Sequence, residues 1–83
     1  MNYDAITIRH STGADRKALL RLAELDEAPA PNGDALLAFV GGELRAAVPL
    51  EKGGAVADPF HLTSDVIDLL RLRARQEIER AAA

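Results

Sequence analysis

The sequence predicts a single small α+β domain over residues 1–83, with the element order β-α-β-β-β-α and a small, mostly antiparallel sheet covered by two helices. The clearest observation is the run from Ala35 to Leu50, in which two apolar stretches are joined by Gly41-Gly42. Two successive glycines reach positive φ without steric cost, so they suit a type I′ or II′ hairpin turn. The second observation is helical periodicity on both sides of this hairpin.

The two predicted strands of this hairpin differ in their apolar pattern. Leu36 to Val40 is apolar on both faces, which is typical of a central strand. Glu43 to Val48 alternates, which predicts a half-solvated strand with Glu43 and Arg45 on the solvated face. The apolar positions should share the covered face: Leu44, Ala46 and Val48. Pro49 cannot donate to a ladder, so we expect this strand to end there or to lie near an edge.

The segment before the hairpin predicts a strand followed by a helix. Ala5 to Arg9 alternates between apolar and polar residues and is the expected first strand. Thr12 is a good N-cap, and Asp15 stands three residues later, where a capping-box acid belongs. The helix should end near Asp26 and bury one apolar face: Ala18, Leu19, Leu22 and Leu25.

Turn signals divide the rest of the chain. Glu27 to Asp34 contains two prolines and an Asn-Gly pair and predicts a loop. Glu51 to Gly54 predicts a second hairpin-type connection, which leads into a short strand at Ala55 to Ala57. Asp58-Pro59 should end that strand, because proline has no N–H to donate to the ladder.

The last predicted helix starts at a cap provided by Thr63 or Ser64 and runs from Asp65 to about Arg80, with Ala81 to Ala83 fraying. Its apolar stripe is wider than one small sheet must cover, and the marginal positions form a possible interface: Leu69, Leu72 and Ile78. We therefore expect self-association, as a homodimer, through this helix or through the exposed edge of the sheet.

Composition narrows the functional classes. The chain has no cysteine, which excludes disulfides and thiolate metal sites, and a domain of this size often gains stability by associating with a copy of itself. The net charge of −3 argues against nucleic acid as the main partner. No apolar run approaches the roughly 20 residues that cross a bilayer, and the N-terminus lacks the pattern of a signal peptide. The expectation is a cytoplasmic protein with no membrane partner.

Two segments resemble the N-terminal part of the GNAT acetyltransferase superfamily. They are I-T-I-R-H-S-T-G-A-D (Ile6 to Asp15), a strand followed by a capped helix, and L-L-A-F-V-G-G-E-L-R-A-A-V (Leu36 to Val48), which is similar to the second and third strands of that superfamily. The resemblance covers about two thirds of the chain. It implies a GNAT-like scaffold and, in a complete member, binding of acetyl-coenzyme A.

The resemblance stops where GNAT chemistry begins. The segment Ala57 to Asp65 corresponds to the glycine-rich loop that holds the coenzyme's pyrophosphate, but it contains no glycine and brings in Asp58 and Asp65. The sole tyrosine, Tyr3, precedes the first strand, so the usual general acid has no counterpart. We therefore expect no catalytic residue, no cofactor and no metal, and a non-catalytic interaction or regulatory module. The alternative is an acyl-coenzyme A-binding or acetyltransferase subunit completed by a partner chain.

The remaining candidates each have a structural alternative. His10 and His61 could serve as a general base or as paired metal ligands, or could be exposed or capping histidines. Asp58, Phe60 and His61 could form a small pocket, or a strand-to-helix corner in which Phe60 plugs the core beneath the hairpin. Four arginines of the last helix could bind nucleic acid, or could belong to a charge-balanced solvated face: Arg71, Arg73, Arg75 and Arg80.

Overall fold

The computed structural model describes residues 6–51, 53–60 and 64–82 and confirms the predicted fold class and element order. The elements are β1 (Ile6–His10), a 3-10 turn η1 (Gly13–Asp15), α1 (Arg16–Asp26), β2 (Ala35–Val40), β3 (Glu43–Pro49), β4 (Val56–Ala57) and α2 (Ser64–Ala82). The four strands form one antiparallel sheet in the order β1-β2-β3-β4. None of the helices in these residues is long and apolar enough to cross a membrane.

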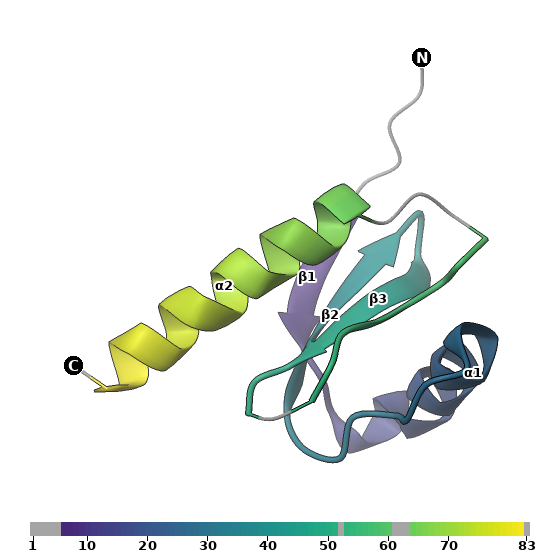
Figure 1. Cartoon of the computed structure of the whole chain (residues 1–83), viewed down its shortest axis with the longest axis horizontal. Coiled ribbons are helices and arrows are strands. Elements are labelled where there is room, and N and C mark those ends of the chain that lie inside the picture. The colour runs from purple at the N-terminus through teal and green to yellow at the C-terminus, as the bar shows by residue number, and fades with distance from the viewer. Residues whose placement is uncertain (1–5, 52, 61–63, 83) are drawn as a thin grey trace.

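The two helices cover opposite faces of the sheet (Figure 1). Since successive strand residues point to opposite faces, neighbouring leucines of β2 belong to different cores. Leu37 packs with the buried side of α1, whereas Leu36 packs with Leu70 and Ala74 of α2. β2 is therefore buried on both faces, as its uninterrupted apolar run predicts.

The hairpin between β2 and β3 has the predicted turn. Gly41 and Gly42 have φ values of 61° and 85°, and Val40 pairs with Glu43 across the turn. Positive φ at both central residues fits a type I′ turn, whose twist matches that of the flanking strands. β3 ends at Pro49, also as predicted.

The predicted faces of β3 are wrong, because the strand contains a β-bulge. Ala38 pairs with Ala46 but Phe39 pairs with Leu44, so Arg45 is an extra residue in β3. The bulge reverses the alternation: Leu44 packs on the α1 side, whereas Ala46 packs on the α2 side. The second half of β3 is buried on both faces rather than half-solvated, because Ala47 packs in the core on the α1 side and Ala46 and Val48 pack in the core on the α2 side.

The positions of the helices agree with the prediction more closely than the residues on their buried faces do. The capping box of Thr12 and Asp15 is present, and α1 ends at Asp26. The buried face of α1 is Leu19, Leu22 and Ala23. Ala18 and Leu25, which we expected on that face, are exposed, because the helix is rotated so that a narrow stripe meets the sheet.

Some predicted boundaries shift by one or two residues. β1 continues to His10, and Ala5 lies outside the described residues. β4 begins at Val56, one residue after the predicted start. α2 continues to Ala82, so helix persists where fraying was expected, and Thr63 lies outside the described residues.

Candidate functional site

His10, at the end of β1, contacts the last helix. Its Nε2 lies 2.9 Å from Oε1 and 2.8 Å from Oε2 of Glu77 in α2. The histidine side chain is more than half exposed, so this contact is a surface link between the edge strand and the helix. Within the described ranges, no group of three or more His, Asp, Glu or Cys side chains converges as metal ligands would.

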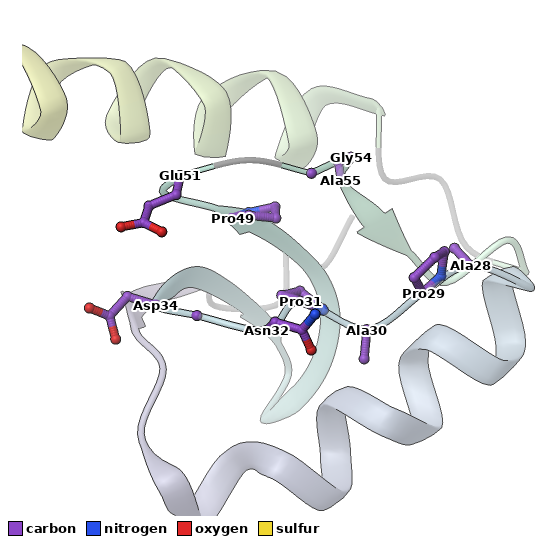
Figure 2. A pocket seen from close by; sticks show the side chains of 12 residues that line it. Ala28, Pro29, Ala30, Pro31, Asn32, Asp34, Pro49, Glu51, Gly54 and Ala55 are labelled. Carbon is purple, nitrogen blue, oxygen red and sulfur yellow. The ribbon is translucent and has the colours of Figure 1, made fainter.

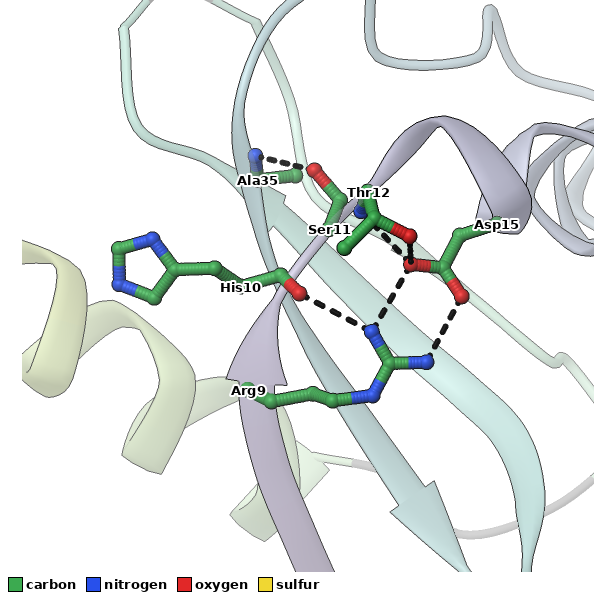
Figure 3. Close-up of polar contacts among 6 residues, drawn as sticks. All are labelled: Arg9, His10, Ser11, Thr12, Asp15 and Ala35. Atoms are coloured by element: carbon green, nitrogen blue, oxygen red, sulfur yellow. Dashed lines mark hydrogen bonds and ion pairs between the residues drawn. The ribbon is translucent and has the colours of Figure 1, made fainter.

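Arg9 and Asp15 form a bidentate ion pair, which Figure 3 shows. The two guanidinium nitrogens Nη1 and Nη2 donate to the two carboxylate oxygens at 2.8 Å and 2.7 Å. Thr12 donates its backbone N–H at 2.7 Å and its hydroxyl at 3.1 Å to Oδ2 of the same carboxylate. These bonds, the guanidinium first, hold the pKa of Asp15 well below its usual range.

This network attaches the edge strand to the start of the first helix. Asp15 is buried, and the guanidinium of Arg9 lies 4.7 Å from the ring centroid of Phe39 on β2. The capping box identified Asp15 and Thr12 from sequence, but nothing local to Arg9 indicates that it reaches six residues ahead. A carboxylate engaged by so many donors is held for structure rather than for proton transfer.

Asp58 forms a second ion pair at the opposite edge of the sheet. Its carboxylate is buried and accepts hydrogen bonds from Nη1 of Arg45 and from the backbone N–H of Phe60, both at 2.8 Å. The bond to a backbone N–H two residues ahead is an Asx turn, which reverses the chain after β4. The structure thus has the strand-to-helix corner that was one of the two interpretations of this segment.

The expectation that Phe60 plugs the core is wrong. Its side chain is 77% exposed, because the Asx turn directs the chain outward at this position. His61 lies outside the described residues. His10 is on β1 and Asp58 follows β4, so three strand spacings, about 14 Å, separate the two edges. The structure therefore does not bring His10 and Asp58 into one pocket.

A cavity of about 540 Å³ lies between the loop after α1 and the segment after β3. Its walls are mainly alanine, proline and glycine, and Figure 2 shows Pro31 and Pro49 across the cavity from each other, with the carboxylates of Asp34 and Glu51 at one end. Among the described residues that line it, none is a histidine, a lysine or a serine. Such a surface can contact a ligand or a chain, and the carboxylates of Asp34 and Glu51 are the ionisable groups among its described lining residues.

The residues expected at an interface are all on the surface. Leu69 is 39% exposed, Leu72 48% and Ile78 51%, and Ile6 on β1 is 50% exposed. β1 differs from β2 and β3 because none of its five residues is buried. The largest uncovered apolar side chains of the sheet edge and of the last helix are therefore available to a partner.

No family model matches the sequence, and comparisons with curated proteins and with solved structures gave no match.

Proposed function

We propose that the protein is a non-catalytic, GNAT-like interaction domain, and that its partner is a second copy of the same chain. The observation that carries this proposal is the state of β1. It is an edge strand with no buried residue and a half-exposed isoleucine, whereas β2 and the second half of β3 are buried on both faces. An uncovered edge of this kind is a ready template for pairing with another chain.

The polar groups support a non-catalytic role. Among the described residues, the buried carboxylates are Asp15 and Asp58, each held by an arginine, and His10 is paired with Glu77. Asp65 lies in the first turn of α2, where a GNAT enzyme would need to attract a pyrophosphate. A negative side chain there opposes the favourable interaction of the helix N-terminus with a phosphate. A cytoplasmic location belongs to the same proposal and is supported by a chain that uses no disulfide.

The test combines the oligomeric state with a ligand titration. Sedimentation equilibrium across a concentration series should show reversible doubling of the 8.9 kDa mass. NMR titration of the ¹⁵N-labelled protein with acetyl-coenzyme A at micromolar concentrations should give no saturable shifts. A protein that stays monomeric up to millimolar concentration contradicts self-association. Saturable shifts contradict the non-catalytic interpretation and favour the alternative, an acyl-coenzyme A-binding subunit completed by a partner chain.

A further inference from the structure

We infer that the open edge of β1 pairs with β1 of a second copy, antiparallel, about a twofold axis at Ile8. This inference rests on the proposed function, because it specifies the surface and the register of that self-association. The result is a continuous sheet of two copies, closed by symmetry.

The hydrogen-bond phase of β1 defines which groups are available. Ser11 donates its N–H to the carbonyl of Ala35 at 2.8 Å, so the backbone groups of Ser11 point toward β2. Backbone groups alternate along a strand, so those of Ile6, Ile8 and His10 point away from β2. In the part of the chain that the structure describes, no strand pairs with this outer side. The outward carbonyl of His10 accepts a hydrogen bond from Nη1 of Arg9. The backbone N–H and carbonyl of Ile8 remain for a partner strand.

The other edge of the sheet is protected, which makes the association a closed one. β4 is two residues long, and the N–H of Ala57 donates to Oδ2 of Asp26 at the end of α1, at 3.2 Å. Pro59 follows two residues later and cannot extend the ladder. Because each copy has one usable edge, pairing gives a twofold dimer rather than a fibre.

The register about Ile8 is self-complementary. Antiparallel pairing across the axis places Ile8 opposite the partner's Ile8, Ile6 opposite the partner's His10, and Thr7 opposite the partner's Arg9. All five residues of the strand are paired, and no two like charges lie directly opposite each other. Arg9 keeps its bonds to Asp15, which lie on the α1 side of the sheet. The facing isoleucines lie on the α2 side, where Ile8 already packs against the core.

One flank of α2 extends the strand into a surface. Glu77 contacts His10 of β1, so it marks the side of the helix that faces this edge. Arg73 and Leu69 precede it at intervals of four residues and lie along the same side. Leu69 and Ile6 are therefore two exposed apolar side chains at the same edge of the molecule, and pairing of β1 strands would bury both.

The other exposed residues of α2 are excluded from this surface by the same geometry. Successive helix residues are rotated by about 100°. Leu72 is two residues from each of the buried Leu70 and Ala74, so it is rotated by about 200° from both and points away from the sheet. Ile78 is nine residues after Leu69, about two and a half helical turns, so it lies on the opposite flank of α2. Among the three residues that the sequence indicated, the inference selects Leu69.

The small size of the surface is typical of a weak, transient interface. A strand of five residues is about 17 Å long. The total surface area buried by the interface is therefore at the lower end of the range for specific interfaces, about 1,000–1,200 Å². We therefore expect a dissociation constant in the micromolar range and a dimer in rapid exchange with the monomer.

Single cysteines test the register, because the chain has no cysteine of its own. Across the axis the two Cα atoms of Ile8 would be about 5.5 Å apart, within the range of a disulfide. Thr7 is the matched control, because its two copies would be offset by two residues and about 8 Å apart, beyond that range. Mild oxidation should cross-link Ile8→Cys at micromolar protein and leave Thr7→Cys monomeric. Equal cross-linking of the two variants would overturn the register.

A pair of lysine substitutions on α2 tests the surface independently. Leu69→Lys should weaken dimerisation at least tenfold in sedimentation equilibrium, whereas Leu72→Lys should change it less than twofold. Far-UV circular dichroism confirms that each variant is folded. Equal effects of the two variants in a dimeric protein would overturn this inference and leave self-association intact through another surface. A monomeric parent protein would overturn both the inference and the proposed function.

Discussion

Replacing Asp15 with asparagine tests the contact that attaches β1 to the start of α1. The substitution removes the charge that receives two hydrogen bonds from Arg9 and two from Thr12. The capping contribution is about 1 kcal/mol. A hydrogen bond to a charged group is worth about 1.5–3 kcal/mol, but Arg9 is 44% exposed and solvent screens part of it. We expect Asp15→Asn to lower the free energy of unfolding by about 2 kcal/mol.

The assay is thermal and urea unfolding followed by circular dichroism at pH 7 and at lower pH. A loss of about 2 kcal/mol corresponds to a fall in Tm of roughly 10 °C for a domain of this size. The pKa of Asp15 is lowered in the folded protein, so its contribution is complete above the unfolded pKa of about 4 and is lost as the pH falls below it. The difference between parent and variant should therefore shrink from pH 5 downward.

Two results would refute this reasoning. An Asp15→Asn variant as stable as the parent at pH 7 would show that the network contributes nothing. A difference that stays constant down to pH 3 would show that the lost stability does not come from the carboxylate charge. Arg16→Gln is the matched control, because Arg16 is an exposed, neighbouring residue that bonds a loop carbonyl instead of Asp15.

Five further substitutions, two of them matched controls, test the fold by urea unfolding. Leu70→Ala should cost about 3 kcal/mol, because Leu70 is fully buried between α2 and the sheet. Leu72→Ala on the outer side should cost less than about 0.5 kcal/mol. Gly42→Ala should cost about 1 kcal/mol, because the residue has φ of 85° in the hairpin turn, whereas Gly33→Ala should be nearly neutral. Phe60→Ala should change stability by less than about 0.5 kcal/mol, because the ring is exposed.

Each of these expectations has a clear contrary outcome. Similar losses for Leu70→Ala and Leu72→Ala would mean that α2 does not pack on the sheet with the described face. A neutral Gly42→Ala would argue against the type I′ turn. A cost of about 3–5 kcal/mol for Phe60→Ala is the value for a buried aromatic ring and would restore the core position expected from sequence.

Local signals in the sequence were sufficient to predict the helices, the strands and the central hairpin. The turn at Gly41-Gly42 needs positive φ at two successive residues, and glycine adopts positive φ without steric cost. The burial of β2 on both faces follows from its uninterrupted apolar run, and the capping box from a spacing of three residues. These features depend on the neighbours of each residue and not on the rest of the fold.

The errors arise where one segment is oriented by another. The bulge at Arg45 depends on pairing with β2, and the bond from Arg45 to the buried Asp58 accompanies it, so an alternating pattern alone assigned the wrong faces. Phe60 is apolar and follows a strand, yet the Asx turn of Asp58 places it in solvent. The bond between Arg9 and Asp15 depends on how β1 meets α1 and has no periodic signal.

The candidate site was predicted in part. The sequence indicated exposed apolar residues on the last helix and a possible role for the edge of the sheet. It could not assign Leu69 to a different side of the helix from Leu72 and Ile78. That assignment requires the contact between Glu77 and His10, which shows how α2 is rotated above β1. It also gave no indication that the cavity after α1 has a second wall formed by the segment after β3.

Amide hydrogen exchange at Ile8, measured by NMR across a protein concentration series, tests the self-pairing of β1 most directly. The N–H of Ile8 points away from β2, while that of Arg9 points toward it in monomer and dimer alike. We predict that exchange at Ile8 slows as the concentration rises through the micromolar range, with Arg9 unchanged. Fast exchange at Ile8 at every concentration, in a protein that sediments as a dimer, would contradict the pairing.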